Sequence, residues 1–104
     1  MTNSEKYRLL QDLRDSNSVT LNNCRITLEK IGDIKYNYVD YLITEPINYD
    51  EELKRFPEAD YDLCCALLSM ILREDQFNNF AKRNKSGEVF SLLDKMLLLL
   101  SDNK

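Results

Sequence analysis

The side chains best suited to chemistry lie together at Arg73, Glu74 and Asp75, directly after a long apolar stretch. Two neighbouring carboxylates could hold a metal ion or a proton, and the guanidinium beside them could bind an anion. The same charges could instead form a salt-bridged helix corner, with Phe77 as its apolar plug. Both interpretations stay open at this point: a polar site, and a structural corner.

Other signals for catalysis or metal binding are few. The chain has no histidine, which disfavours most general acid–base and nucleophilic-triad chemistry. Its three cysteines, Cys24, Cys64 and Cys65, lack the Cys-x-x-Cys spacing of a zinc site, and an odd number is a poor disulfide framework. We therefore expect buried thiols, no metal and no cofactor, in a protein that leans away from catalysis.

Size and hydrophobicity predict one domain over residues 1–104. Of the 104 residues, 43% are hydrophobic, which is enough for a real core. The N-terminus lacks the basic start and apolar core of a secretory signal. The longest apolar run, 63–72, is much shorter than the roughly 20 residues that span a bilayer. We therefore expect a cytoplasmic protein without membrane contact.

Charge is distributed unevenly along a chain whose net charge is −4. Acidic residues dominate between 45 and 62, where Glu51, Glu52 and Glu58 are candidate binding residues. A negative chain without a stripe of Lys and Arg disfavours direct nucleic-acid binding. Such an acidic surface suits a basic protein partner, and it is also typical of a plain solvated face.

The segment 18–43 decides the fold class. Apolar and polar residues alternate there, at Cys24, Ile26 and Leu28 and again from 34 to 38. This period of two predicts half-buried strands joined by polar turns. We therefore expect a small antiparallel meander, within an α+β fold that is predominantly helical.

A helical interpretation of the same segment stays open. Four of its apolar residues recur at helical spacing: Leu21, Cys24, Leu28 and Ile31. Gly32 follows them and could end such a helix in a left-handed conformation. The fold would then be all-α.

Helical signals are clearer elsewhere in the chain. Thr2 and Glu5 form a capping box before a predicted N-terminal helix over about 3–15. Asn48 is one of two residues placed to cap a short helix in the middle of the chain. Asp60 is placed to cap a central helix that is apolar round most of its circumference, as expected of a buried helix.

A last helix, expected after a cap at Ser86, pairs with the central one. Its inward-facing residues are Val89, Leu92, Leu93, Met96 and Leu100. Leu98 and Leu99 extend the apolar surface further round this helix. They would either pack beneath the N-terminal helix, which we favour, or form a surface for self-association into a homodimer.

The C-terminal half resembles a known family. It has an apolar helix that ends in Leu-Arg-Glu-Asp-Gln-Phe at 72–77, then Gly-Glu-Val at 87–89 and a closing apolar helix. Over residues 60–100 this pattern is similar to that of a family of small bacterial domains of unknown function with a C-terminal Leu-Arg-Glu/Asp-x-x-Phe motif. Gln76 stands where that family often has His or Arg, and 78–79 lack the glycine of its turn. The resemblance implies a fold for this half and no activity.

Together these patterns favour a non-catalytic protein–protein interaction module. Its partner surfaces would be the acidic segment and Leu98 with Leu99. A specific form is a small acidic regulator or inhibitor of a nucleic-acid-handling protein, in a bacterial or mobile-element context. The alternative is an enzyme or ligand-binding domain built around Arg73, Glu74 and Asp75, which requires a pocket at that corner.

Overall fold

The computed structural model describes residues 2–73 and 87–102, and all regular structure in these residues is helical. The elements are α1 (Asn3–Asp15), α2 (Leu21–Ile31), the 3₁₀ helix η1 (Tyr38–Tyr41), α3 (Tyr49–Leu53), the 3₁₀ helix η2 (Phe56–Glu58), α4 (Tyr61–Arg73) and α6 (Glu88–Asp102). The described residues contain no strand. The predicted α+β class is therefore wrong, and the all-α alternative is confirmed.

The predicted meander over 18–43 is replaced by α2 and the 3₁₀ helix η1. Thr20 caps α2, and its hydroxyl oxygen accepts a hydrogen bond from the backbone N–H of Asn23 at 3.1 Å. A strand would have placed Ile26 on the same face as Cys24 and Leu28, but Ile26 is 47% exposed while the other two are buried. The helical period prevails because it buries Ile31 in place of Ile26.

Gly32 ends α2, as the helical alternative requires. Its φ of 77° lies in the left-handed region, which glycine adopts without the steric penalty of a Cβ. The N–H of Gly32 donates to the carbonyl of Glu29 at 3.1 Å, and the N–H of Asp33 donates to that of Leu28 at 3.0 Å. This arrangement satisfies the last carbonyls of α2 and turns the chain toward α4.

The predicted capping residues of three other helices are confirmed. The Thr2 hydroxyl accepts from the N–H of Glu5 at 3.1 Å, and α1 follows with the bounds expected. The N–H of Glu51 donates to the side chain of Asn48 at 3.0 Å. The N–H of Leu63 donates to Asp60 at 2.8 Å. Each of these bonds satisfies a backbone donor that a helix start leaves without an internal partner.

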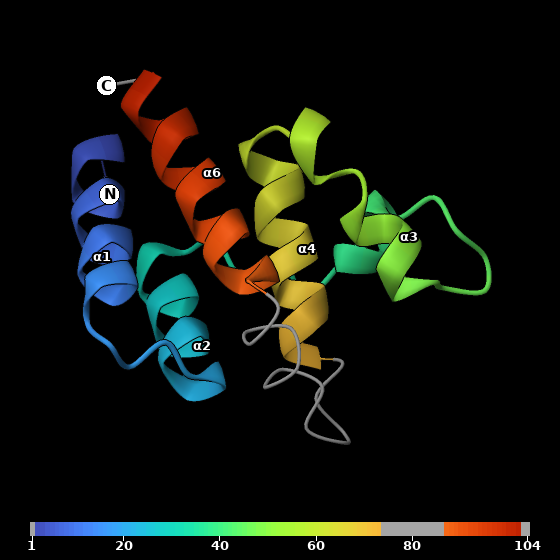
Figure 1. Ribbon diagram of the computed structural model, residues 1–104, viewed down its shortest axis with the longest axis horizontal. Helices are drawn as coiled ribbons and strands as arrows, with labels where there is room; N and C mark the ends of the chain where they lie inside the picture. The colour runs from blue at the N-terminus through green and yellow to red at the C-terminus, as the bar shows by residue number, and fades with distance from the viewer. Residues whose placement is uncertain (1, 74–86, 103–104) are drawn as a thin grey trace.

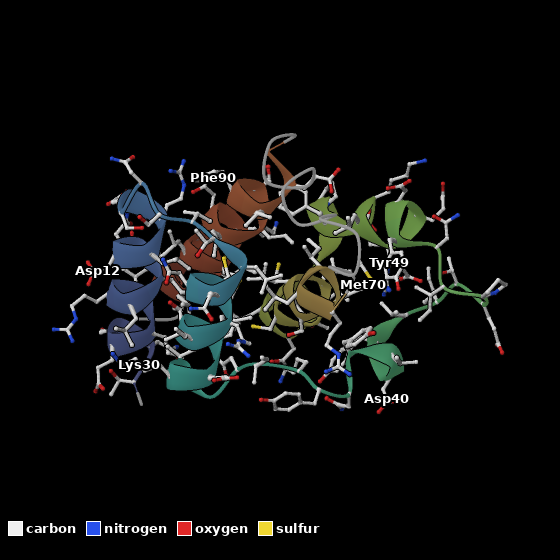
Figure 2. The ribbon with its side chains drawn as sticks, turned by 90° about the horizontal axis from the view of Figure 1, so that it is seen from below. Asp12, Lys30, Asp40, Tyr49, Met70 and Phe90 are labelled. Carbon is white, nitrogen blue, oxygen red and sulfur yellow. The ribbon has the colours of Figure 1, made fainter. Side chains whose placement is uncertain are left out.

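Helix α4 is the axis of the core. It lies between α6 and α3 in Figure 1, and it also contacts α2. Its residues 64–71 are all buried, so the helix is enclosed round most of its circumference. Met70 lies at the centre of the molecule in Figure 2, where side chains from several helices meet. The prediction of a buried central helix is confirmed.

The last helix, α6, packs between α4 and α1 (Figure 1). All five residues predicted to face inward are buried: Val89, Leu92, Leu93, Met96 and Leu100. The cap predicted at Ser86 lies outside the described residues. Within the described ranges, no helix has both the length and the apolar character to cross a membrane.

Residues 38–58 form a separate region beside α4, which we call the peripheral lobe. It comprises η1, α3 and η2 with their connecting loops, and it lies on the opposite side of α4 from α1 (Figure 1). Tyr49, Leu53 and Phe56 are half-buried where the lobe packs on the core. Short helices and loops therefore cover one flank of the buried axis.

Candidate functional site

A cavity of about 220 Å³ opens between α2, the connection after Gly32 and the end of α4. Each of these three elements contributes one cationic side chain to it: Arg25, Lys35 and Arg73. We call this cavity the basic groove. Arg73 is far from the other two in the sequence, so only the fold brings all three cations together.

Ser69 holds the connection against α4. Its hydroxyl donates to the carbonyl of Cys65 at 2.7 Å and accepts from the N–H of Lys35 at 2.9 Å. The hydroxyl is buried, so both bonds are protected from water. A hydroxyl on the central helix thus fixes the position of the segment that carries one of the three cations.

A second anchor fixes the start of the connection. The Tyr61 hydroxyl donates to Asp33 at 2.6 Å, and the Lys6 ammonium pairs with the same carboxylate at 2.9 Å. Burial is the main cause that raises the pKa of Tyr61, and the Asp33 carboxylate adds to it, so the hydroxyl remains a donor. Residues from α1 and α4 therefore hold the chain where it enters the basic groove.

The basic groove also has an apolar part. Leu21, Ile34 and Leu72 line it, and each is half-buried against the hydrophobic core. These three side chains expose carbon surface that a ligand could cover. The cavity therefore combines positive charge with an apolar lining.

The three cations of the groove differ in how they are engaged. Arg25 donates to the side chain of Asn22 at 2.8 Å, a neutral partner. Lys35 lies 3.7 Å from Asp62, a loose ion pair. The exposed side chain of Arg73 makes no ion pair or hydrogen bond within the residues that the structure describes. Arg73 is therefore the cation with most freedom to receive a ligand.

Electrostatics keep Lys35 charged. Burial is the largest single influence and lowers the pKa of its ammonium, but the neighbouring acidic groups, Asp62 first and then Tyr41, Cys65 and Asp33, together raise it by more. Its pKa therefore lies above the ordinary value for lysine. The groove carries this positive charge throughout the physiological pH range.

Tyr36 and Glu29 complete the lining. The phenol ring of Tyr36 is 71% exposed, and its hydroxyl donates to the Glu29 carboxylate across a long 3.5 Å contact. An exposed aromatic ring at the edge of a cavity can stack on a ligand or cover its apolar part. Glu29 is the single acid among the described residues of the lining, where the positive side chains outnumber it.

Of the polar site predicted at Arg73, Glu74 and Asp75, the structure describes Arg73 alone. Arg73 lines the basic groove, at the end of α4. Glu74 and Asp75 lie outside the described residues. The cations that the structure places with Arg73 are Lys35 and Arg25, which the sequence analysis did not select.

The predicted acidic residues separate into exposed and buried ones. Glu51 and Glu58 are exposed in the peripheral lobe, and Glu51 pairs with Lys54 at 2.8 Å. Glu52, by contrast, is fully buried, with a relative exposure of 0%. Its carboxylate is therefore unable to contact a partner at the surface.

Glu52 instead forms a clamp inside the peripheral lobe. One carboxylate oxygen accepts from the backbone N–H groups of Ile43 at 3.0 Å and Thr44 at 2.7 Å, and from the Thr44 hydroxyl. The other accepts from Arg55 at 2.9 Å, and Arg55 also donates to the carbonyl of Tyr41 at 2.8 Å. A single carboxylate thus ties α3 to the loop after η1.

These hydrogen bonds keep the Glu52 carboxylate charged. Burial raises its pKa, but the bonds from Thr44, Arg55 and Ile43 stabilise the charged form by more. The pKa of Glu52 therefore lies below its ordinary value. We assign this residue to the stability of the lobe.

The two leucines of the predicted self-association surface are not alike. Leu98 is 56% exposed, whereas Leu99 is half-buried and packs on the hydrophobic core. Single exposed leucines are common on monomeric proteins. The apolar surface that remains for a partner at this position is therefore small.

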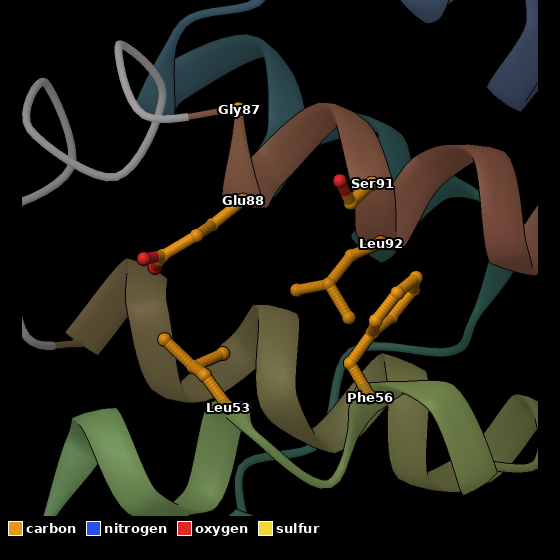
Figure 3. A pocket seen from close by; sticks show the side chains of 6 residues that line it. All are labelled: Leu53, Phe56, Gly87, Glu88, Ser91 and Leu92. Carbon is orange, nitrogen blue, oxygen red and sulfur yellow. The ribbon is translucent and has the colours of Figure 1, made fainter.

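A smaller cavity of about 140 Å³ lies between the lobe and the start of α6. Figure 3 shows Leu53 and Phe56 on one side of it and Leu92 on the other, with Glu88 and Ser91 along α6. Its lining is largely apolar, and the part of the chain that the structure describes contributes no cation to it. This cavity offers less to a charged ligand than the basic groove does.

The three cysteines are free and buried. Burial raises the pKa of Cys24 and Cys65 to about 12 and that of Cys64 to about 11, so the reactive thiolate forms are suppressed. Over residues 2–73 and 87–102, no three cysteine, aspartate or glutamate side chains gather as a metal site would require. The prediction of buried thiols is confirmed.

Part of the basic groove has a signal in the amino-acid sequence. Leu21, Arg25 and Glu29 follow one another at intervals of four, so they share one face of α2 once that segment is helical. The predicted strands did not indicate this face, because it exists only when the segment is helical. The approach of Lys35 to Arg73 depends on long-range packing and has no local signal.

The chain was also compared with protein-family models, with curated proteins and with solved structures, and none of them matches it. The similarity of residues 60–100 to a family of small bacterial domains therefore stays a prediction. Any functional conclusion rests on the geometry of the chain itself.

Proposed function

We propose that this chain is a ligand-binding domain whose basic groove receives an anionic group. Arg73 supplies the principal charge, and Arg25 and Lys35 supply the others. The groove binds and orients its ligand, and the main contacts are charge-assisted hydrogen bonds from the cations. This proposal develops the alternative of a ligand-binding domain built around Arg73. The residues that act with Arg73 are now Arg25 and Lys35.

One observation carries the proposal: cations from three separate elements line one partly apolar cavity. Like charges repel, and among the described residues these three cations meet one lining carboxylate, Glu29, and one loose ion pair, so gathering them is unfavourable for folding alone. The fold nevertheless fixes the backbone of the segment that carries Lys35, whose N–H donates to the buried Ser69 hydroxyl. Such an arrangement is expected where an anion completes the site.

Binding is better supported than catalysis by the groups in the groove. Within residues 2–73 and 87–102, its titratable acids are Glu29 and the phenol of Tyr36, which contact each other. General acid–base catalysis needs a group positioned against a substrate and tuned toward neutral pH. The groove offers charge and shape for recognition, so we assign it a binding role.

A titration followed by nuclear magnetic resonance tests this proposal, with citrate as the probe anion. Citrate should shift the backbone amides of Arg25, Lys35 and Leu72 in the wild-type protein. An Arg73→Gln substitution should weaken this binding about tenfold or more, the effect of losing one charge-assisted contact of roughly 1.5–3 kcal/mol. The substitution changes an exposed side chain, so the fold should be retained.

Arg8→Gln is the matched control, because Arg8 is an exposed arginine on α1 and does not line the groove. It removes the same charge and should leave citrate binding within about twofold of wild type, since exposed charges at a distance are screened by salt. Equal weakening by the two substitutions would show a general charge effect and contradict the proposal. So would unshifted groove amides at millimolar citrate.

The acidic interaction module is a second candidate, supported by a different observation. Val39 is 54% exposed and Ile43 72% exposed in the peripheral lobe, which also carries exposed Glu51 and Glu58. A lobe that exposes both apolar and acidic side chains suits a basic amphipathic segment of a partner protein. Binding of a basic amphipathic peptide should fall steeply with salt and be lost in a Glu51→Lys/Glu58→Lys double variant; salt-insensitive binding would exclude this candidate.

A further inference from the structure

The size of the basic groove limits what it can hold. Its volume is about 220 Å³. Pockets for drug-sized ligands and cofactors are larger, roughly 300–1,000 Å³. The groove therefore suits a small group, of the size of one or two amino-acid side chains. A compact anion or a short piece of another protein would fit it, and a nucleotide cofactor would not.

The residues that line the basic groove favour some small anions over others. Leu21, Ile34 and Leu72 present carbon surface beside the cations, and Tyr36 exposes an aromatic ring at the edge. A purely inorganic anion would leave this apolar surface uncovered. A ligand with an aliphatic group next to a carboxylate would cover it and gain from its burial.

Nucleic acid is a poorer fit than an acidic peptide. The chain has a net charge of −4, so a polyanion is repelled overall. Proteins that bind nucleic acid commonly neutralise several phosphates in a row, whereas the described lining of this groove has three cations and one acid, Glu29. A ligand with one or two carboxylates matches this local charge.

We therefore infer that the basic groove docks a short acidic segment of a partner protein in which a glutamate or aspartate adjoins a leucine-like side chain. This inference rests on the proposed function. Arg73 and Lys35 bind the carboxylate, and the aliphatic side chain lies on Leu21 and Leu72. The partner surface is thus an acidic and apolar strip, complementary to the groove in charge and in lining.

Two capped hexapeptides with equal charge test the inference. Each carries two glutamates; leucines flank them in one peptide and serines in the other. The wild-type protein should bind the leucine peptide about tenfold more tightly or better, because burying one leucine side chain is worth roughly 1.5–3 kcal/mol. Titration calorimetry gives both affinities, and Arg73→Gln should weaken binding of both peptides.

A pair of substitutions on α2 separates the apolar contact from the charge. Leu21→Ser should bring the affinities of the two peptides close together, because Leu21 lines the groove. Ile26→Ser is the matched control on the same helix, since Ile26 is 47% exposed and does not line the groove. It should leave the preference intact. Circular dichroism confirms that each variant folds, and the wild-type comparison of the peptides stands even where a variant does not.

Other results of these binding experiments separate failure of the peptide inference from failure of the proposed function. Equal binding of both peptides and of citrate, weakened by Arg73→Gln, would overturn the peptide inference and leave the proposed function standing. Failure of every anion to bind would overturn both. Tighter binding of a short single-stranded oligonucleotide than of the leucine peptide would also overturn the inference, because it would make nucleic acid the favoured ligand.

Discussion

The helical bundle and the peripheral lobe are stabilised in different ways. The bundle of α1, α2, α4 and α6 buries long apolar side chains along whole helices. The lobe, residues 38–58, has short helices and exposed apolar residues, and its fully buried side chain is the carboxylate of Glu52. The bundle depends on the hydrophobic effect, whereas the lobe depends on one well-satisfied polar group.

This difference in stabilisation explains where the proposed binding site lies. The basic groove forms where α2 and α4 of the bundle meet the connection that leads to the lobe. The bundle supplies rigid helices for Arg25 and Arg73, and Ser69 fixes the connection that carries Lys35. Sites placed on rigid elements hold their geometry better than sites on loops alone.

The largest expected effect comes from breaking the bundle. Leu68 is fully buried on α4, so Leu68→Ala removes a packed side chain and leaves a cavity. The free energy of unfolding should fall by about 2–5 kcal/mol, measured by chemical denaturation. A loss below about 1 kcal/mol would contradict the assignment of α4 as the buried axis.

The lobe should respond to a single polar change. Glu52→Gln removes a charged acceptor of several hydrogen bonds, and the free energy of unfolding should fall by about 1.5–3 kcal/mol. Hydrogen exchange should accelerate most at the amides of Ile43 and Thr44. Glu51→Gln, at an exposed neighbour, should change stability by about 0.5 kcal/mol or less.

The difference in stability between wild type and Glu52→Gln should change with pH in a definite direction. The pKa of Glu52 is lowered in the folded protein, so its charged form stabilises the fold above the ordinary value of 4.5. This stabilisation is lost as the pH falls through the lowered pKa. The gap between wild type and Glu52→Gln should therefore be constant above about pH 5 and narrow below the ordinary value. A gap that widens on acidification would refute the clamp.

A smaller effect is expected at the joint between the two regions. Gly32 has a φ of 77°, so Gly32→Ala places a Cβ in the left-handed region although no neighbouring atom lies within 4 Å. Stability should fall by about 1 kcal/mol, measured by thermal unfolding. An unchanged or raised melting temperature would mean that α2 does not end there as described.

The smallest effect is expected at the surface of the bundle. Leu98 is 56% exposed, so Leu98→Ala should change the free energy of unfolding by about 0.5 kcal/mol or less. Sedimentation at high protein concentration should give the same mass for wild type and variant. A large loss of stability together with dissociation of a dimer would instead establish the self-association surface that includes Leu99.

The sequence predicts the bundle better than the lobe, for physical reasons. Capping at Thr2 and the apolar periodicity of α4 and α6 are local signals, and they gave the right helices. The segment of α2 is ambiguous because Cys24 and Leu28 satisfy a period of two as well as a helical one. The positions that decide between them are Ile26, which is exposed, and Ile31, which is buried.

The site was less predictable than the fold because it depends on contacts between distant residues. Arg73 could be selected as a charge at the end of an apolar helix. Lys35 joins it through a hydrogen bond to Ser69, 34 residues away in sequence, which no local pattern indicates. The role of Glu52 was missed for the same reason, since Ile43 and Thr44, which donate to its carboxylate, lie in a separate loop, and its burial is decided by the tertiary fold.

A graded series of substitutions at residue 73 most directly tests whether the basic groove binds an anionic ligand through Arg73. The affinity of the leucine-containing acidic peptide should be measured for wild type and for Arg73→Lys, Arg73→Gln and Arg73→Glu, together with the stability of each. Affinity should fall in that order, because Lys retains the charge without the planar fork, Gln removes the charge and Glu reverses it, while stability stays nearly constant. Equal affinities across the four proteins would contradict binding at the basic groove.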